Sequence, residues 1–571
     1  MTLKSREKCN ERLNMENYTT AKTMIEVMNR HDVEFVFFNP GIDNVPVLET
    51  IAAYQAQGQK APRGILCLDE FVAMTAAHGS WMASGKPQVV SVHSELGVLQ
   101  VGGALHNAQW GKVPIVFFTE VQEPLERTNW QGESFDQGAM VRSFVKWDHQ
   151  VKMGEDAGEA LNQALSIALT EPCGPVYLSL PRQMFWSKDK IKAKLSYNPA
   201  IGAPPKTDLA LLEKAADILL QAENPLIITG YAGRHATTVM ALIELAETLA
   251  TRVLSTDTWV NFPNTHPMAA YLSSTVGFSN PLLTEADVIF TIDYDMHYAA
   301  PRVTPNSKAK IIHLDIDVKK KGVPLWGIPP DIQINADSGQ AIPALITLIK
   351  QKLTKERREE LQKRFKTLSA EHDKLDGEWQ SIAQSHAKNK PITSHWLTRC
   401  IDEIKDDNTI IVNQTISPAT IVFHELHLDK PGKLFSCGGG CIGWAPGAAL
   451  GVKLASPDKT VISLMGDGAF IYGCPEASLW SADFYKAPFL AVIYDNQGYG
   501  AIKGLFHEKY NVINMGADIP APPDYDLIAR ANKAYGLTVD NPADVPQALK
   551  DCLAAVRNGQ AAVLDVKLAP V

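Results

Sequence analysis

The sequence predicts an α/β protein with three doubly wound domains, each built on a parallel sheet. Short apolar runs rich in Val, Ile and Leu, such as EFVFF, PLIITG and TVISLMG, recur along all 571 residues. They are continuous rather than alternating, as expected of strands buried on both faces. Helix-like stretches separate them, and this alternation predicts parallel sheets covered by helices on both sides.

Two stretches interrupt this alternation and divide the chain. Residues 186–206 are charged and contain prolines, so we interpret them as a linker. Residues 352–391 are highly charged and helix-forming, and we expect a connector with a solvated face. A chain of this length exceeds one core. We therefore expect an N-terminal tail at 1–16, a first domain at 17–185, a middle domain at 207–351 and a third domain at 392–571.

The composition excludes several classes of function. The net charge of −9 and the pI near 5.9 argue against a nucleic-acid partner held by phosphate contacts. The sequence lacks an apolar run of about 18 residues, so we expect no membrane span. The first twenty residues are charged and lack the apolar core of a signal peptide, so we expect a cytoplasmic protein.

The cysteines and histidines do not form a metal-binding or disulfide pattern. The eight cysteines are scattered, and we interpret Cys437 and Cys441 as small residues in a tight turn. His424 and His427 in FHELHLD are three residues apart, whereas a zinc-binding helix needs a spacing of four. We therefore interpret FHELHLD as a solvated helix end.

A glycine-rich turn begins the informative part of the third domain. The stretch KLFSCGGGCIGWAPGAALGVKLA combines a strand, a glycine turn and an Ala-rich helix. Gly438, Gly440 and Gly443 fit the pattern G-x-G-x-x-G, which favours a phosphate at the helix N-terminus. Taken alone, the turn leaves open a nucleotide-binding oxidoreductase that uses NAD.

The next two strands predict a metal site. One ends in Gly466-Asp467-Gly468, and after 26 intervening residues (469–494) another ends in YDNQGYG. The carboxylate of Asp467 and the amide oxygen of Asn496 thus lie at the carboxyl ends of separate strands, where open α/β sheets bind ligands. With the carbonyl of Gly498 and phosphate oxygens they suit an octahedral Mg²⁺ ion.

This spacing resembles the cofactor signature of thiamine-diphosphate (ThDP) enzymes, which is GDG followed by an Asn pair. Asp495 stands here in place of the first Asn. The segments VFFNPGIDNVPVLE, VVSVHSELG, GALHNAQWGKVPIV, FVKWD, GPVYLSLP, VNQTIS and CGGGCIGWAPGAALG also resemble the benzoylformate decarboxylase and acetolactate synthase group. The resemblance implies a pyrimidine-binding domain, a middle domain of the transhydrogenase III type and a diphosphate-binding domain. It also implies ThDP, Mg²⁺ and a homodimer or homotetramer with sites between chains.

Two neighbouring carboxylates at a strand–helix junction take different roles under this resemblance. In RGILCLDEFVAM, Asp69 is well placed to cap the following helix. Glu70 matches the family's glutamate that contacts the aminopyrimidine ring and promotes loss of the thiazolium proton.

The resemblance also implies further cofactor contacts. Ile442 matches the apolar residue that bends the cofactor, and the carbonyl of Gly440 would accept a hydrogen bond from the exocyclic amine. Ile416 and Ala469 replace hydroxyl residues of the family, although backbone N–H groups can substitute for them. The other positions implied to bind the cofactor are Asn39, Pro40, Gly41, Ser417, Gly468, Ala469 and Tyr499.

The substrate side departs from the decarboxylase pattern. His93 and His297 match its two catalytic histidines, whereas Ile42 replaces a serine that contacts the substrate. Glu95 adds a carboxylate that disfavours an acidic substrate. The pocket positions implied by the resemblance are Ile42, Glu95, Ile502 and Leu505. FAD in the middle domain is left open, because GYAGRHA and APRVTP only faintly echo the acetolactate synthase site.

The sequence therefore predicts a ThDP- and Mg²⁺-dependent enzyme that cleaves or forms a C–C bond next to a 2-oxo group. A 2-oxo acid decarboxylase, an acetolactate synthase-like carboligase and a hydrolase of 1,2-diketones all fit. The substrate would be a small 2-oxo acid, diketone or aldehyde. A ThDP-binding paralogue without catalytic activity is a further alternative.

Overall fold

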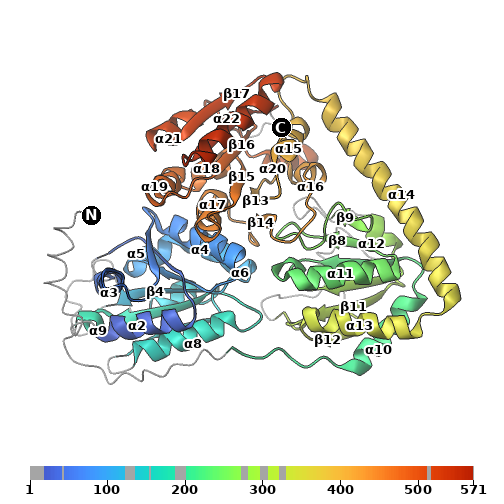
Figure 1. Cartoon of the computed structure of the whole chain (residues 1–571), viewed down its shortest axis with the longest axis horizontal. Helices are drawn as coiled ribbons and strands as arrows, with labels where there is room; N and C mark the ends of the chain where they lie inside the picture. Colours follow the sequence, from blue (N-terminus) through green and yellow to red (C-terminus); the bar gives the residue numbers. More distant parts are fainter. Residues whose placement is uncertain are drawn as a thin grey trace.

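Three six-stranded parallel sheets, one in each domain, form the framework of the protein (Figure 1). The computed structural model describes residues 19–41, 44–121, 136–152, 156–186, 201–271, 281–295, 306–320, 330–510 and 516–569. The predicted fold class of three parallel α/β domains is confirmed. The expected N-terminal tail, most of the expected linker, Ile42 and His297 lie outside the described residues.

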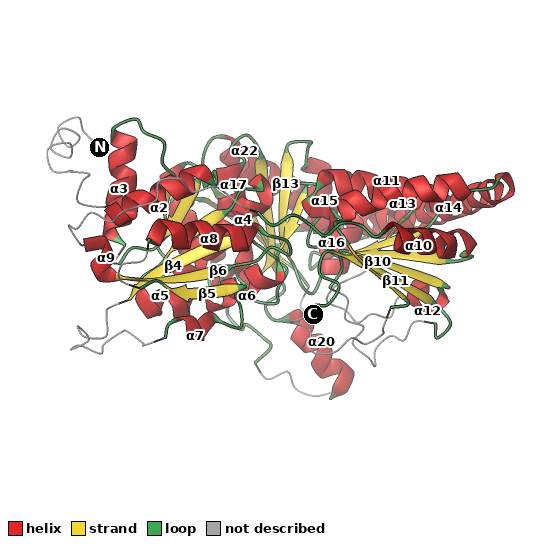
Figure 2. Cartoon of the chain, turned by 90° about the horizontal axis from the view of Figure 1, so that it is seen from below, coloured by secondary structure: helices red, strands yellow, loops and turns green. Residues whose placement is uncertain are grey.

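The first domain has the strand order β2-β1-β3-β4-β6-β5. In Figure 2, α2 and α8 cover one face of this sheet, and α5 and α7 cover the other. The strands are β1 (Phe35–Phe38), β2 (Arg63–Leu66), β3 (Gln88–Ser91), β4 (Ile115–Val121), β5 (Trp147–Gln150) and β6 (Val176–Pro181). The helices are α2 (Thr19–Arg30), α3 (Val45–Ala56), α4 (Glu70–Ser84), α5 (Ser94–Gln100), α6 (Gly102–Trp110), α7 (Gly138–Val141), α8 (Ala157–Leu169) and α9 (Arg182–Trp186).

The middle domain has a different order, β12-β11-β10-β7-β8-β9. Its strands are β7 (Pro225–Thr229), β8 (Arg252–Ser255), β9 (Ala269–Tyr271), β10 (Val288–Ile292), β11 (Lys310–Asp315) and β12 (Ile332–Asn335). Its helical segments are α10 (Leu209–Gln221), η3 (Ala232–Arg234), α11 (Ala236–Leu249), α12 (Pro281–Glu285) and α13 (Ser338–Lys352).

The third domain repeats the topology of the first, because its order β14-β13-β15-β16-β18-β17 is the same when the strands are counted from its own start. The strands are β13 (Thr409–Gln414), β14 (Leu434–Ser436), β15 (Thr460–Gly466), β16 (Leu490–Asp495), β17 (Tyr535–Val539) and β18 (Ala562–Lys567). The helical segments are α15 (Ser394–Ile404), α16 (Ala419–Glu425), α17 (Trp444–Ala455), α18 (Asp467–Tyr472), α19 (Pro475–Tyr485), α20 (Gly500–Lys509), α21 (Tyr525–Ala531), η4 (Pro542–Asp544) and α22 (Val545–Arg557).

A single long helix, α14 (Lys355–Ser385), connects the middle domain to the third domain and runs along the edge of the molecule (Figure 1). Its exposed charges agree with a solvated face. The neighbouring FHELHLD segment was predicted wrongly, because Glu425 is buried against His395 and the ring of His424 stacks on Trp379 of α14. Among the described helices, none is long and apolar enough to cross a membrane.

Helices α4 and α17 occupy equivalent places in the first and third domains and pack against each other (Figure 1). Their backbones come close because glycines lie at the contact. A Cβ on Gly451 would lie 1.8 Å from the carbonyl oxygen of Ala76, and one on Gly79 would lie 2.2 Å from that of Ala448. The close packing ties the junction that carries Glu70 to the helix that follows the glycine-rich turn.

Candidate active site

The carboxyl ends of three adjacent strands gather most of the site residues predicted in the first domain. Strand β1 lies between β2 and β3, and the three strands lead into Asn39–Gly41, Glu70 and His93. Since parallel strands end at the same edge of a sheet, these residues share one edge. The sequence-predicted groups of the first domain are thus placed together.

Asp69 and Glu70 lie where β2 turns into α4. Asp69 is the N-cap in extended conformation, and its carboxylate accepts hydrogen bonds from the backbone N–H groups of Phe71 and Val72 at 2.8 and 3.2 Å. The predicted helix cap is confirmed. Glu70 is the first residue of the helix, where the positive end of the helix dipole favours a carboxylate.

The turn after β3 holds His93 in an unusual local conformation. His93 precedes α5, and the next residue, Ser94, has a φ of +41° although it carries a side chain. Such backbone strain often accompanies a functional site. Asn44 links this edge together, because its amide oxygen accepts from Gly41 N at 2.8 Å and its nitrogen donates to Ser91 Oγ at 3.1 Å.

A cavity of about 470 Å³ lies at the carboxyl edge of the third sheet. The strands β14, β13, β15 and β16 are neighbours in that order, so the turns that follow them converge. The cavity collects eleven of the residues predicted from the sequence: Ile416, Ser417, Gly440, Ile442, Asp467, Gly468, Ala469, Asn496, Gly498, Tyr499 and Ile502. Leu505, exposed on α20, does not line it.

Asp467 is the most deeply buried charged group of this cavity. Its two carboxylate oxygens accept the backbone N–H groups of Gly468 and Gly498 at 2.8 and 2.9 Å. Burial raises the pKa of Asp467 to about 6, and the nearby carboxylate of Asp495 acts in the same direction. A divalent cation would relieve this concentration of negative charge. The carboxylate and the adjacent amide of Asn496 therefore form a donor set that fits Mg²⁺.

Asp495, which stands in place of the first Asn of the ThDP signature, is paired with a lysine that the sequence analysis did not predict. Asp495 is fully buried, and Lys567 on the adjacent strand β18 places its Nζ 2.5 Å from Asp495 Oδ2. Asp495 Oδ1 accepts from Gln497 N at 3.0 Å and so supports a turn in which Gln497 has a φ of +56°. The sequence carried a signal, since the last strand, AVLDVK, contains two charged residues, Asp565 and Lys567, and Lys567 also pairs with Asp565 at 2.8 Å.

The glycine-rich turn serves domain packing more than phosphate binding. A Cβ on Gly438 would lie 2.4 Å from Gly111 N, and one on Gly439 would lie 2.5 Å from the amide oxygen of Asn107. Gly443 has a φ of +88° and is the N-cap of α17. Gly440 alone among these glycines faces open space. This geometry disfavours the dinucleotide interpretation of the turn.

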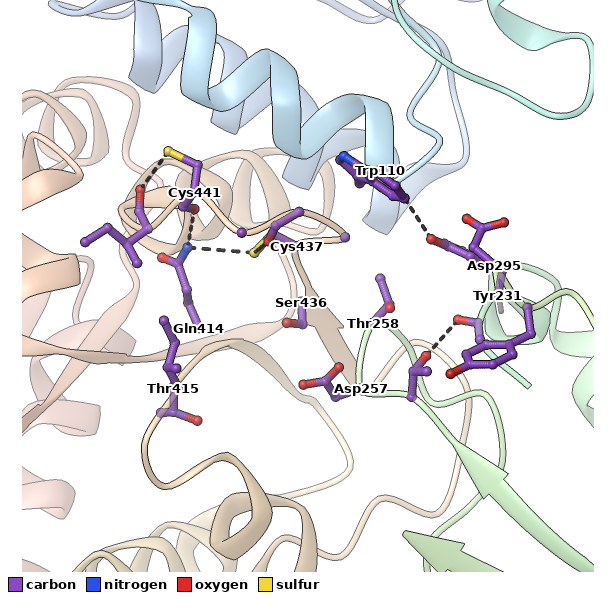
Figure 3. A pocket seen from close by; sticks show the side chains of 18 residues that line it. Trp110, Tyr231, Asp257, Thr258, Asp295, Gln414, Thr415, Ser436, Cys437 and Cys441 are labelled. Atoms are coloured by element: carbon purple, nitrogen blue, oxygen red, sulfur yellow. Dashed lines mark hydrogen bonds between the residues drawn. The ribbon is translucent and has the colours of Figure 1, made fainter. Parts of the chain in front are cut away.

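A second cavity, of about 350 Å³, adjoins the first and was not predicted (Figure 3). Gln414, Ile416, Gly440 and Ile442 line both cavities. The second cavity lies between the strand ends of the middle domain and the glycine-rich turn, and its middle-domain wall includes Tyr231, Thr256, Asp257, Thr258, Tyr294 and Asp295. Trp110 of α6 closes one side. These residues come from domains with separate sheets, so no short sequence pattern could predict that they lie together.

The two groups of predicted residues remain apart within one chain. Among the described residues that line the larger cavity, all belong to the third domain. Glu70, His93 and Glu95 lie at the edge of the first sheet instead. The chain therefore supplies two half-sites, one with the catalytic acid candidate and one with the metal candidate.

Comparison with known protein families agrees with this arrangement. Residues 18–140 match the N-terminal TPP binding domain of thiamine pyrophosphate enzymes, residues 212–345 match their central domain, and residues 417–566 match their C-terminal TPP binding domain. The chain belongs to the thiamine pyrophosphate enzyme family.

Relatives within the family differ in activity. The chain is 27% identical to benzoylformate decarboxylase of Pseudomonas aeruginosa over 94% of this chain and 97% of that protein. It is 25% identical to the large subunit of acetolactate synthase isozyme 3 of Escherichia coli over 97% and 95%. A probable 2-ketoarginine decarboxylase of P. aeruginosa is also 25% identical over 96% and 94%. At these identities the relatives do not fix the reaction.

Solved structures show the same fold. The 4-hydroxybenzoylformate decarboxylase of Rhodococcus jostii superposes with a TM-score of 0.81 at 22% identity, covering 97% of this chain and 99% of that one. Benzoylformate decarboxylase of Polynucleobacter necessarius gives 0.80 at 20% identity over 97% and 100%.

Proposed function

We propose that the protein is a ThDP- and Mg²⁺-dependent enzyme that cleaves or forms a C–C bond adjacent to a 2-oxo group. One observation carries the proposal. Asp467, Asn496 and Gly498 meet Gly440 and Ile442 in a single cavity at the carboxyl edge of the third sheet. In the sequence, Gly440 and Gly498 are nearly sixty residues apart. The family match at both TPP-binding domains supports the same cofactor.

The residues of the larger cavity would divide the work of holding the cofactor. Asp467, Asn496 and the carbonyl of Gly498 would bind Mg²⁺, which would in turn hold the diphosphate. Ser417 and the backbone around Gly468 would donate to phosphate oxygens. A Cβ on Gly468 would lie 2.6 Å from the ring of Tyr499, so only glycine leaves the backbone accessible there. Ile442, which lines the same cavity, would offer an apolar contact to the cofactor.

Glu70 would act on the cofactor rather than on the substrate. When bound, ThDP supplies the thiazolium carbon that attacks the substrate carbonyl and the ring that accepts the electron pair released on cleavage. The carboxyl group of Glu70 would hydrogen-bond the pyrimidine ring of bound ThDP and favour the imino tautomer, whose exocyclic nitrogen can then serve as the base for the thiazolium proton. His93, at the same sheet edge, would move protons at the substrate oxygen.

We further propose that two chains share each site. Glu70 is not among the described residues that line the cavity of its own chain, and large apolar side chains are exposed around both half-sites. Leu96 and Leu99 of α5 are 55% and 62% exposed, and Ile502, which lines the third-domain cavity, is 47% exposed. Such surface commonly marks an interface. A second copy would cover these residues and bring its Glu70 to the cavity.

Complementation tests this shared site directly. We expect Glu70→Gln and Asp467→Asn to be inactive separately. In a mixed dimer, one site combines both defects and the other combines intact Glu70 with intact Asp467. Co-refolded or co-expressed mixtures should therefore regain activity. If each site lay within one chain, every site would carry one defect and no activity would return.

The residues predicted to line the substrate pocket favour an uncharged substrate. Glu95 lies in the first turn of α5, close to His93, and a carboxylate there disfavours an acidic substrate. A carboligase or a 1,2-diketone hydrolase therefore fits alongside a 2-oxo acid decarboxylase. A product screen with pyruvate, benzoylformate and diketones, each with and without an added aldehyde, separates the three. Absence of any product in the presence of bound ThDP would contradict the proposed catalysis.

A further inference from the structure

The middle sheet has the strand order of dinucleotide-binding proteins. Counted from its own start, the order is 6-5-4-1-2-3, the reverse listing of 3-2-1-4-5-6. The order reverses between β7 and β10, whose last paired residues are Thr229 and Ile292. In such sheets, nucleotides bind outside the carboxyl ends of the strands at this switch point.

The backbone at this switch point is already engaged. A phosphate would bind to the N–H groups of the turn after β7. Here, Gly230 N and Tyr231 N both donate to the carbonyl oxygen of Asp293, at 3.2 and 2.9 Å, and Gly233 N donates to the side chain of Asn261 at 2.8 Å. The donors that a diphosphate requires are thus bonded within the protein.

The two glycines of the turn allow close packing of protein groups. A Cβ on Gly230 would lie 2.9 Å from the ring of Tyr294, and one on Gly233 would lie 2.5 Å from Trp259 Cβ. Arg234, at the end of the turn, is directed inward: its guanidinium contacts Asp293 at 3.0 Å and Glu171 of the first domain at 3.1 Å. Its charge is therefore engaged by carboxylates.

A second group of charges extends this contact between the domains. Lys320 bridges Asp295 and Asp315 at 2.7 Å each, and its side chain is 4% exposed. Lys112 of the first domain reaches Asp295 at 2.8 Å and lies 4.0 Å from the centre of the Tyr231 ring. Burial alone would raise the pKa of Asp295, but the two lysines hold it well below its usual range.

These groups form what we call the ion cluster: Lys112, Arg234, Asp293, Asp295, Asp315 and Lys320. Its carboxylates lie at the ends of β10 and β11, where a diphosphate would have to approach. Like charges there would repel it. The cluster thus fills the switch point with paired charges and opposes the binding of an anionic nucleotide.

The ion cluster also reaches the cofactor cavities through one short loop. Tyr231 donates its hydroxyl hydrogen to the carbonyl of Trp110 at 2.8 Å, and Lys112 lies two residues further on. Between them, Gly111 packs against Gly438, where a Cβ would lie 2.4 Å from Gly111 N. Residues 110–112 therefore contact the middle domain and the glycine-rich turn together, as Figure 3 shows for Trp110, Tyr231 and Asp295.

We propose that the ion cluster replaces a nucleotide at the switch point of the middle domain, and that Lys112 is a positioning residue for the glycine-rich turn of the cofactor site. The chain then needs neither FAD nor an adenine nucleotide to assemble that site. Lys112 contacts no reacting atom; it fixes the loop against which the turn packs.

Nucleotide titration tests the first part without reference to ThDP. FAD and ADP are added to the full-length protein up to about 1 mM, and binding is followed by flavin fluorescence and by thermal shift, since a site of any functional strength saturates in this range. We expect no saturation with either nucleotide. Stoichiometric binding of FAD or ADP would overturn the proposal.

Variants of Lys112 test the positioning. Lys112→Met should weaken ThDP binding, measured by quenching of tryptophan fluorescence, by about tenfold, the usual size of coupling through a packed network. Lys112→Arg should stay within about threefold because the charge is kept. Lys350→Met is the matched control, because Lys350 pairs with Glu244 at 2.6 Å with both side chains half exposed. It should leave ThDP binding unchanged.

Two results would contradict the positioning role: Lys112→Met with wild-type ThDP affinity, or Lys350→Met with an equal loss. If Lys112→Met does not fold, Tyr231→Phe replaces it, since it removes the hydroxyl that donates to the Trp110 carbonyl and interacts with Asp295; unchanged affinity in that variant would also overturn the role. The measurement of ThDP affinity rests on the proposed function. If the wild type binds no ThDP, the proposed function fails, while nucleotide titration still decides the inference.

Discussion

Gly451 marks the tightest approach between α4 and α17, and its replacement has a calculable effect. A Cβ there would lie 1.8 Å from Ala76 O, whereas a carbon normally approaches a carbonyl oxygen to about 3.3 Å. Gly451→Ala therefore separates the two backbones by about 1.5 Å, the difference between these values. The surrounding buried residues, including Val72 and Leu450, lose contact as the helices move apart.

The expected loss can be estimated from these terms. Overpacking of this kind costs about 3 kcal/mol, while alanine in place of glycine stabilises a helix by about 1 kcal/mol. The net destabilisation of about 2 kcal/mol lowers the melting temperature by about 5 °C for a unit the size of the third domain. Thermal unfolding followed by circular dichroism measures this shift.

The control is Gly377→Ala in the exposed connector α14, where a Cβ meets nothing within 4 Å. Only the helix propensity changes there, so the variant should be as stable as the wild type or more stable by up to about 1 kcal/mol. A Gly451→Ala protein that melts at or above the wild-type temperature would refute the inferred contact between α4 and α17.

Three further predictions concern charged and titratable groups. Lys567→Met leaves the buried Asp495 and Asp565 without their shared cation and should destabilise the protein by about 3 kcal/mol, whereas adding Asp495→Asn removes one of the two carboxylates and should restore part of the melting temperature; no recovery in the double variant would contradict the pairing. The ring of His424 stacks on that of Trp379 with 4.0 Å between ring centres, and burial lowers the pKa of His424 to about 4. The contribution of neutral His424 to the free energy of unfolding is therefore complete above pH 6.5 and is lost as the pH falls through about 4. Urea unfolding of His424→Phe should show a flatter pH profile in that window than the wild type. Glu70→Gln should lower kcat by about 100-fold or more while ThDP still binds, and full activity would exclude its assigned role.

The strands that could be predicted from apolar runs in the sequence differ in burial from the strands that could not. Fourteen continuous apolar runs matched strands of the three sheets, but β5, β9, β12 and β17 had no such run. All four lie at sheet edges. An edge strand has one neighbour and more contact with solvent, so polar residues such as those of WDHQ in β5 are tolerated and the apolar signal disappears.

The half-sites were predictable for a related reason. Asp467 and Asn496 directly follow apolar strands, Glu70 follows the end of β2 within four residues, and strand ends converge in a parallel sheet. Contacts between strands that are not consecutive in the chain, and contacts between domains, leave no such local sign. The pairing of Lys567 with Asp495 depends on which strand lies next to β16, and the approach of Gly111 to Gly438 depends on how two domains pack.

Reconstitution of stripped protein measures the central claim most directly. The protein is freed of small molecules by dialysis against a chelator and assayed for turnover of pyruvate, benzoylformate and diketones. We expect no turnover with ThDP alone or with Mg²⁺ alone, and turnover of at least one substrate when both are added, because in the proposed function Asp467 and Asn496 would bind the metal that in turn would bind the diphosphate. Turnover that is independent of ThDP, or no binding of ThDP in the presence of Mg²⁺, would contradict the account.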